Sequence, residues 1–237
     1  MNELLQEYLW ILFWYIVPCF GAGLIVLFIR FVFKPKEYIY RKILHICAAS
    51  TVFCFILPSH TWWICLLAVL TILVLIDITL FIIMRFKFYQ LLFVDKEKYE
   101  ILKMINAYYL VMMVLITFFF GLRGEFNRFL VITAILSWGL GDASAALVGI
   151  GFGSHFINIP FVDKKKTIEG SIAMFISSWA AALITLLIFM NYPVWKLVIA
   201  PLVLAIFLTI VEAISKKGLD TVTCPLTALV ILLLFSL

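Results

Sequence analysis

The residues best able to do chemistry stand in one short run, Asp163-Lys164-Lys165-Lys166-Thr167-Ile168-Glu169-Gly170-Ser171, directly before an apolar segment. Lysines attract phosphate, and free backbone N–H groups at the start of a helix bind it. Thr167 and Glu169 are candidate cap residues, and Gly170 lets a ligand approach the backbone. The run therefore indicates a polyphosphate cradle, although no GxxxxGK[ST] P-loop is present. The alternative is a lysine anchor against anionic lipid.

Three acidic residues, Asp142, Glu212 and Asp220, lie within or at the ends of apolar segments. An ionised side chain in a membrane span costs about 2.5–3.5 kcal/mol on insertion scales, so it indicates function by default. Helix packing accounts for the glycines around Asp142 but not for the acid itself. Magnesium is usually held by one or two carboxylates together with phosphate oxygens. The three acids therefore predict a site for Mg²⁺ or Mn²⁺, with a simple loop as the alternative around Asp220.

A third constellation is Arg41-Lys42-Ile43-Leu44-His45. Arg41 and His45 are four residues apart and therefore share one face of a helix. They either bind phosphate or a lipid hydroxyl, or act only as a membrane anchor and an interfacial imidazole. Asp77 also lies in an apolar segment, and the sequence does not decide whether it pairs structurally or reaches the site.

The elements that position these residues are membrane helices. Of the 237 residues, 66% are hydrophobic and only 13% are charged, with a mean hydropathy of +1.19. Soluble domains carry about a quarter charged residues, so soluble, disordered, collagen-like and disulfide-framework proteins are excluded. We expect an all-α, polytopic helical bundle that forms a single domain over residues 1–237. Eight spans of about 20 residues are predicted, the second and eighth short enough to be tilted or broken: 8–33, 43–58, 61–84, 104–121, 127–149, 170–190, 194–214 and 221–237.

Basic residues orient this bundle through the positive-inside rule. One side receives 15 of the 18 lysines and arginines, and the other receives only Arg123, Arg128 and Lys196. The richer side is predicted to be cytoplasmic, and the even number of spans then leaves both termini external. The three polar constellations lie on that same side, so the active site is predicted to face the cytoplasm.

Four motifs together resemble the polyprenol kinase family, which comprises dolichol kinase, phytol kinase and the CTP-dependent diacylglycerol kinase and is distantly similar to the CDP-diacylglycerol synthases. The resemblance covers roughly residues 38–237, and the motifs occur in family order. Two positions differ, because the family often has Lys or Arg at Ser154 and Asn at Thr221. The motifs are Arg41-Lys42-x-x-His45, Gly141-Asp142-x-x-Ala145 with Gly149 and Gly153, Lys165-Lys166-Thr167-x-Glu169-Gly170-Ser171, and Gly218-x-Asp220-Thr221-x-Thr223-x-Pro225-Leu226.

The resemblance implies transfer of the terminal phosphate of CTP to the hydroxyl of a membrane lipid alcohol, with a divalent metal. The acceptor is a polyprenol, phytol or geranylgeraniol, or diacylglycerol. The chemistry then suggests a role for each group of residues. Asp142, Asp220 and Glu212 would serve the metal, Lys165 and Lys166 would clamp phosphate, and Glu169 would orient or deprotonate the acceptor. Phosphate oxygens would be held by Thr167, Gly170, Ser171 and Thr223, with Arg41 and His45 binding phosphate or the lipid hydroxyl.

Two other functions stay open. One is CTP:phospholipid cytidylyl transfer, although the Lys-Asp, His-Gly-Gly and Asp-Arg signature of the synthases is absent. The other is a transporter or scramblase. Two observations argue against it: the acids cluster toward one face, and no clear inverted repeat is present. The expected partners are a membrane lipid and a nucleotide, with no nucleic acid. A homodimer is compatible with the spacing of Gly149 and Gly153.

Overall fold

The computed structural model describes residues 2–85, 98–160, 162, 165–215 and 218–236, and within them the chain is built from helices. This part contains no β-strand, only an isolated antiparallel bridge between Phe156 and Thr167. The prediction of an all-α chain is therefore confirmed. In order, the elements are α1 (Asn2–Phe33), α2 (Glu37–Ser50), α3 (Val52–Ile56), α4 (Trp62–Ile83), α6 (Lys98–Leu115), the π-helix η1 (Ile116–Leu122), the 3-10 helix η2 (Glu125–Arg128), α7 (Phe129–Phe152), α8 (Ile168–Phe189), α9 (Val194–Ile214) and α10 (Asp220–Phe235).

Seven helical stretches in this part of the chain are long and apolar enough to cross a membrane. They coincide with the first seven predicted spans, and the eighth corresponds to α10, which has only 16 residues. The second stretch, Glu37–Ile56, begins earlier than predicted and changes from α2 to α3 at Thr51. The Thr51 hydroxyl donates to the carbonyl of Ala48 over 2.7 Å, a side-chain bond of the kind that bends helices.

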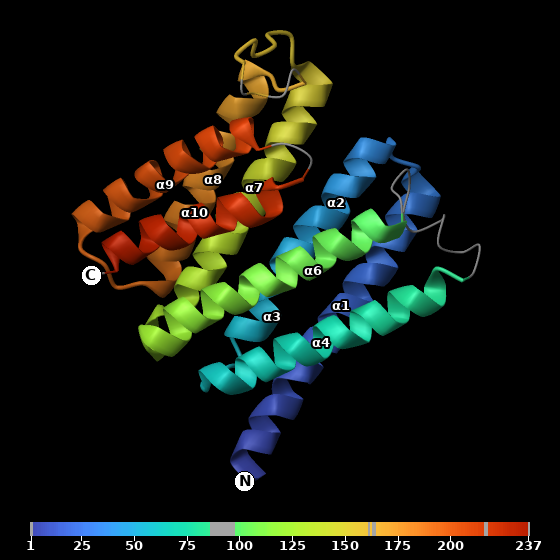
Figure 1. Ribbon diagram of the computed structural model, residues 1–237, viewed down its shortest axis with the longest axis vertical. Coiled ribbons are helices and arrows are strands. Elements are labelled where there is room, and N and C mark those ends of the chain that lie inside the picture. Colours follow the sequence, from blue (N-terminus) through green and yellow to red (C-terminus); the bar gives the residue numbers. More distant parts are fainter. Residues whose placement is uncertain (1, 86–97, 161, 163–164, 216–217, 237) are drawn as a thin grey trace.

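The connections that carry the predicted site lie at one end of the bundle. In Figure 1 the α1–α2 connection, the end of α7, the start of α8 and the start of α10 lie in the upper part of the view, whereas the two chain ends lie at its bottom and left. Five of the basic residues used for orientation, Lys87, Lys96, Lys164, Lys216 and Lys217, fall outside the described residues, as does Asp163.

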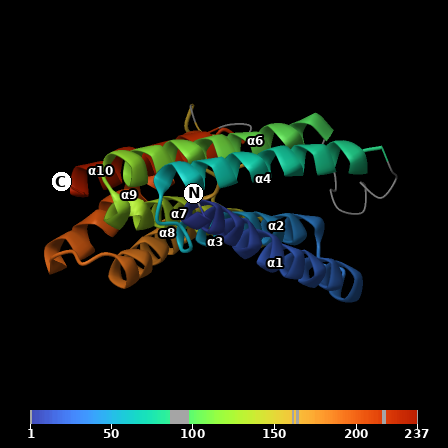
Figure 2. The ribbon, with the colours of Figure 1, turned by 90° about the horizontal axis from the view of Figure 1, so that it is seen from below.

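The helices form two layers. Figure 2 shows α4, α6 and α10 in one layer, above α1, α2, α7, α8 and α9 in the other. Helix α7 belongs to the most buried of the long apolar stretches and packs against both α2 and α8. The helix that carries Asp142 is therefore the centre of the molecule.

Glycines allow α7 to approach its neighbours closely. A Cβ atom at Gly139 would lie 2.5 Å from the Cβ of Ala49 in α2, and one at Gly141 would lie 2.2 Å from the Ser178 hydroxyl in α8. Small residues at such positions let membrane helices pack backbone to backbone. Across the same contact, Ser178 donates to the carbonyl of Ser137 over 2.8 Å.

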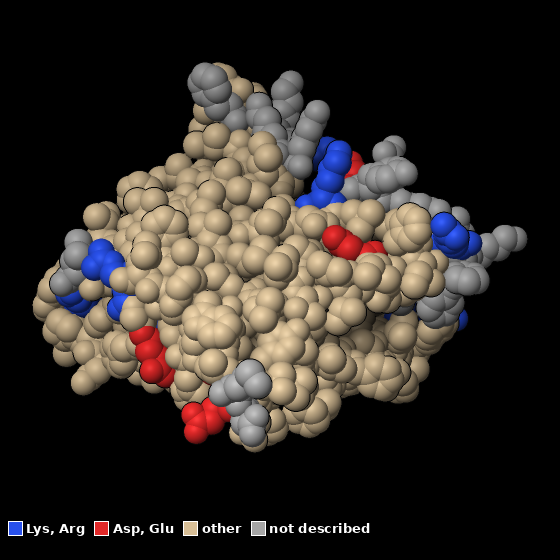
Figure 3. All heavy atoms as spheres, turned by 60° about the horizontal axis from the view of Figure 1, so that its bottom comes forward, with Lys and Arg blue, Asp and Glu red and all other residues tan. Residues whose placement is uncertain are grey.

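The outer surface of the bundle is apolar. In the view of Figure 3, charged side chains occupy only small areas of a face that is otherwise formed by other residue types. Helix α1 is the least buried of the long stretches, and Phe20 on it is 70% exposed. A surface of this kind is stable against lipid chains and not against water.

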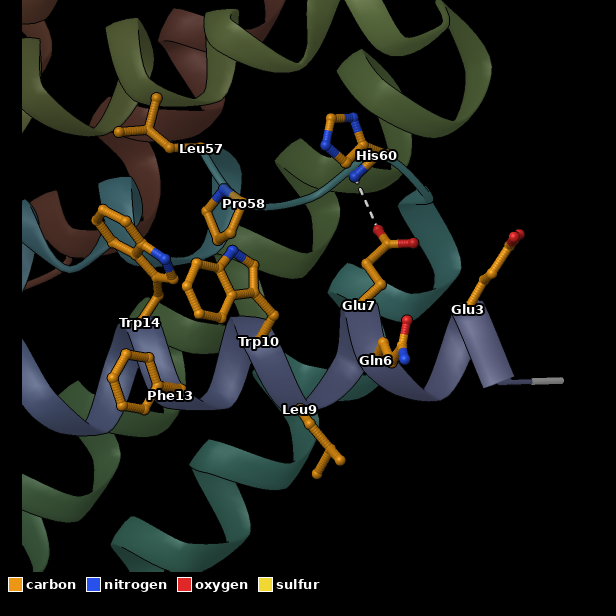
Figure 4. A pocket seen from close by; sticks show the side chains of 10 residues that line it. All are labelled: Glu3, Gln6, Glu7, Leu9, Trp10, Phe13, Trp14, Leu57, Pro58 and His60. Carbon is orange, nitrogen blue, oxygen red and sulfur yellow. Dashed lines mark hydrogen bonds between the residues drawn. The ribbon is translucent and has the colours of Figure 1, made fainter.

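At the end opposite the predicted site, Glu7 of α1 caps helix α4. Its carboxylate accepts hydrogen bonds from the backbone N–H groups of His60 and Thr61, both over 2.7 Å, and from the Thr61 hydroxyl over 2.8 Å. Figure 4 shows Glu7 directed at His60. A carboxylate at a helix N-terminus is stabilised by the helix dipole as well as by these bonds, so Glu7 holds α1 against α4.

We predict that Glu7→Gln lowers the free energy of unfolding by about 1–3 kcal/mol, because charged acceptors contribute most to such hydrogen bonds. The measurement is thermal unfolding in detergent. Glu3→Gln is the matched control, since Glu3 lies on the same helix and its carboxylate lies away from His60 in Figure 4. Equal melting temperatures for the two variants would contradict this account of α1.

Candidate functional site

A cavity of about 320 Å³ opens where α2, α7, α8 and α9 meet. We call it the lysine cavity. It brings together eight of the residues predicted from sequence, Arg41, Asp142, Lys165, Lys166, Thr167, Gly170, Ser171 and Glu212. Its other lining residues are Tyr38, Lys42, Ala145, Ala146, Gly149 and Ile150.

Asp142 meets two cationic or ionisable groups from α2. The Lys42 ammonium donates to its Oδ2 atom over 2.6 Å, and the His45 Nε2 atom lies 3.2 Å from the same oxygen. Lys42 and His45 are three residues apart, so both project from one face of α2. The His45 ring also packs edge-on against Trp138, with the ring centroids 4.9 Å apart. The predicted membrane acid is therefore paired, and α2 supplies its partners.

A second ion pair joins the loop before α8 to α9. Lys166 donates to the Oε1 atom of Glu212, whose side chain is only 3% exposed. Asp220, at the first turn of α10, is within electrostatic reach of Asp142, Lys42, Lys166 and Glu212, but it is not among the residues that line the cavity. The two ion pairs, Lys42–Asp142 and Lys166–Glu212, place positive and negative side chains next to each other around the lysine cavity.

The start of α8 is capped from within the chain. The Thr167 hydroxyl accepts from the Gly170 N–H over 3.1 Å, and the Thr167 carbonyl accepts from the Ser171 N–H over 3.0 Å. The Ile168 N–H donates to the carbonyl of His155. The predicted role of Thr167 as a cap is confirmed. These three backbone N–H groups therefore have partners within the chain and are not the free amides that the sequence analysis expected to bind phosphate.

Glu169 lies away from the cavity wall. Its Oε1 atom is 2.8 Å from the Ser154 hydroxyl and 2.7 Å from His155 Nδ1, and it accepts from the backbone N–H of both residues. The carboxylate therefore holds Ser154 and His155, just after α7, against the start of α8. These contacts favour a structural role for Glu169 over the predicted action on the acceptor.

Two further polar residues are engaged elsewhere. The Thr223 hydroxyl bonds to the Ser215 hydroxyl over 2.8 Å and to the carbonyl of Leu219 over 3.0 Å, which ties the ends of α9 and α10 together. Asp77 accepts from the side-chain amide of Asn106 over 3.1 Å. Of the two alternatives left open for Asp77, this contact favours structural pairing between α4 and α6.

Metal ligation is not preformed. Within the described ranges, no group of three or more His, Cys, Asp or Glu side chains is arranged to hold a metal ion. Two carboxylates, Asp142 and Glu212, nonetheless line one cavity. Magnesium needs only one or two carboxylates when phosphate oxygens complete its shell, so the donor set is compatible with a metal that arrives with a phosphate ligand.

Lys42 is the main residue of the lysine cavity that the sequence motifs include but to which the sequence analysis gave no role. It stands beside Arg41 in a basic cluster, and composition does not tell which of two adjacent cations faces the protein. Its three-residue spacing to His45 places both on one face of α2, but the four-residue spacing of Arg41 does the same, so spacing alone does not choose between the two cations. Gly149 and Gly153, predicted to permit contact between chains, pack against Thr167 of the same chain: a Cβ atom at either position would come within 3.0 Å of this residue.

A larger groove, about 910 Å³ in volume, lies beside α1 at the opposite end of the bundle, where Trp10, Trp14 and Glu7 line it (Figure 4). It contains none of the residues predicted for the site, and Glu7 is already engaged in capping α4. The lysine cavity is therefore the better candidate.

Comparison of the chain with protein-family models, with curated proteins and with solved structures gives no match.

Gly170, which lines the lysine cavity, brings α8 into close contact with α7. A Cβ atom there would lie 2.9 Å from the backbone oxygen of Ala145, which cannot move without moving α7. We predict that Gly170→Ala lowers the free energy of unfolding by about 1–3 kcal/mol through overpacking. Gly151→Ala is the control, because nothing lies within 4 Å of the added Cβ atom. Thermal unfolding of both variants is the measurement, and equal stability would contradict the close approach.

The Lys166–Glu212 pair is predicted to be strongly coupled. Lys166→Met leaves Glu212 charged and buried, and breaking a buried pair costs about 3–5 kcal/mol. The double variant Lys166→Met/Glu212→Gln removes both charges and should regain most of that loss. A double-mutant cycle from denaturation curves measures the coupling, and additive losses would show that the pair is not one unit.

Proposed function

We propose that the chain is a CTP-dependent lipid kinase, which transfers the terminal phosphate of the nucleotide to the hydroxyl of a membrane lipid alcohol. The observation that carries the proposal is the pairing of Lys42 with Asp142 and of Lys166 with Glu212 around one cavity at the start of α8. The resemblance of four motifs to the polyprenol kinases supports the same reaction. Three of those motifs contribute residues to this cavity.

The ion pairs allow the lysines to exchange a carboxylate partner for a phosphate partner. Without nucleotide, the lysines neutralise carboxylates that burial would otherwise make costly. A nucleotide brings negative phosphate oxygens, to which Lys42, Lys165 and Lys166 can turn. Phosphoryl transfer requires little beyond such cationic clamping and alignment of the acceptor. A cavity that stores paired lysines is therefore suited to bind a phosphate chain.

In the proposed reaction the acceptor oxygen attacks the terminal phosphorus of CTP. The new bond joins this oxygen to phosphorus, and the bond between phosphorus and the bridging oxygen breaks with its electron pair leaving on CDP. The hydroxyl proton passes to solvent. The products are a lipid phosphate, CDP and one proton.

Magnesium, when bound, neutralises charge on the phosphate oxygens. Asp142 and Glu212 are the residues that would hold it, because both carboxylates line the lysine cavity. Asp220 is near enough to contribute electrostatically. When the lysines turn to phosphate, both carboxylates are freed for this purpose.

The proposal includes a topology. The lysine cavity faces the cytoplasm, where the nucleotide is available, and both chain ends lie on the opposite side of the membrane. Helix α10 then completes an eighth crossing, tilted or with local thinning of the bilayer to match its 16 residues.

The decisive experiment offers purified protein CTP or ATP labelled at the terminal phosphate, with Mg²⁺ and a panel of prenols, fatty alcohols and diacylglycerol. We expect label to appear in a lipid phosphate, with CTP preferred. Release of pyrophosphate with no labelled lipid would favour cytidylyl transfer instead. No nucleotide turnover with any lipid would overturn the proposal.

Asp142→Asn is predicted to lower the rate of transfer at least about 100-fold, the usual cost of removing a group that acts in the transition state. Asparagine keeps the size of the side chain but removes its charge. Lys103→Met is the control, because Lys103 lies on α6 outside the cavity lining. The readout is the initial rate with CTP and the best acceptor. Equal rates for the Asp142 variant and the control would remove Asp142 from the mechanism.

A further inference from the structure

The chain that leaves α7 carries large apolar side chains that the other described residues leave uncovered. We call residues 153–160, which follow α7, the exit segment. Phe156 and Ile159 in this segment are 64% and 57% exposed, and Phe152, the last residue of α7, is 80% exposed. Single apolar residues on a protein surface are ordinary. Three such residues so close together, outside the interior of any spanning helix, indicate an interaction surface.

The backbone of the exit segment is held against the start of α8. The Ile157 N–H donates to the carbonyl of Lys166, and the Ile168 N–H donates to the carbonyl of His155, both over 2.9 Å. The Glu169 carboxylate in the first turn of α8 accepts from the His155 N–H over 3.2 Å. Three hydrogen bonds therefore fix this segment, and the apolar side chains that it exposes are presented from a defined position.

The length of α7 places the exit segment at a surface of the bilayer. The ion pair between Glu125 and Arg128, directly before α7, marks the opposite surface. Helix α7 has 24 residues, which is about 36 Å at the helical rise and about 34 Å along the membrane normal at an ordinary tilt of about 20°. The hydrocarbon layer is about 30 Å thick. Phe152 and the exit segment therefore lie at the depth of the lipid headgroups, just beyond the hydrocarbon.

The exit segment continues the outer apolar surface of α8. Ile168, Ile172 and Ile176 follow one another at intervals of four residues and are about half exposed, so they form one outward face of this helix. Helix α8 is long and apolar enough to cross a membrane, and this face is the part that lipid must cover. The bridge between Phe156 and Thr167 joins the exit segment to the residue directly before that face. One apolar surface therefore runs from α8 onto the exit segment.

We propose that the exit segment is a membrane-binding surface, from which Phe152, Phe156 and Ile159 insert into the leaflet at the lysine-cavity end of the bundle. Apolar side chains of interfacial segments lie about 5–10 Å deep, at the boundary between headgroups and acyl chains. Lipid is the occupant because the apolar surface is continuous with that of a spanning helix and lies at the depth of the bilayer surface. A partner protein or a second copy of the chain would instead shield these residues from lipid.

This membrane-binding surface adjoins the lysine cavity. Gly149 lines the cavity, and Phe152 lies three residues further along the same helix. Thr167 also lines the cavity, and its backbone forms the bridge to Phe156. Insertion of the exit segment therefore fixes the adjoining wall of the cavity at the depth of the headgroups. This inference concerns binding to the membrane, and it holds whether or not the chain transfers phosphate.

The first test replaces Phe156 by a fluorescent amino acid in the full chain, reconstituted in nanodiscs without nucleotide. We expect quenching by lipids that carry bromine on the acyl chains near the glycerol, and little quenching by iodide in the buffer. The same fluorophore in place of Ile172 is the reference for full contact with lipid. Quenching by iodide alone would place the exit segment in water, and protection from both quenchers would show that a protein surface covers it. Either result would overturn the inference.

The second test asks whether the phenylalanines cause the insertion. With the fluorophore in place of Ile159, Phe152→Ser/Phe156→Ser should lower the equilibrium constant for insertion at least about tenfold, because two large apolar side chains no longer leave water. Iodide should then quench the fluorophore. The matched control is Ile184→Ser/Ile188→Ser, which makes the same kind of change on exposed residues further along α8 and should keep the protection. Unchanged protection in the phenylalanine variant, or equal loss in the control, would contradict the inference.

Discussion

The organising constraint in this molecule is the burial of two carboxylates, Asp142 and Glu212, inside a bundle whose outer surface is made for lipid. Neither charge is stable there alone, because breaking a buried pair costs several kcal/mol. Lys42 and Lys166 neutralise these carboxylates, and each lysine lies on a different element. Helix α2 must therefore pack on α7, and the loop before α8 must reach α9. The glycines of α7 allow the first of these contacts, with Gly139 against Ala49, and bring α7 and α8 together through Gly141.

The same contacts divide the interior into two environments. On one side of His45 lies the lysine cavity, where Lys42 pairs with Asp142 and Lys166 pairs with Glu212. On the other lies a cavity of about 270 Å³ to which Tyr108, Tyr109 and Trp138 contribute aromatic rings. A reaction between a charged nucleotide and an apolar alcohol requires both environments in contact, since neither reactant is stable in the surroundings of the other.

Sequence reasoning reaches the parts of this structure that depend on composition and local pattern. Charge clusters delimit the spans, and an acid within an apolar run identifies Asp142 as unusual. Contacts between residues far apart in the sequence cannot be predicted in this way. Nothing local distinguishes Lys42 from Arg41, and the use of Glu169 to fold the α7–α8 connection depends on where Ser154 and His155 lie. The amides expected to be free at the start of α8 have partners: the chain before the helix returns so that His155 accepts from Ile168, and Thr167 itself accepts from Gly170 and Ser171. The cavity on the far side of His45 combines residues from six helices, and no sequence motif predicts it.

The most direct test of the central claim is the affinity for CTP, measured by equilibrium dialysis with Mg²⁺ on the protein in nanodiscs. The comparison is between the natural chain and Lys166→Met/Glu212→Gln, which removes a phosphate clamp without leaving a buried charge unpaired. The account predicts binding by the natural chain and a loss of at least about tenfold in affinity for the double variant, with 1.4 kcal/mol for each factor of ten. Equal affinity in the two proteins, or no CTP binding by the natural chain, would contradict it.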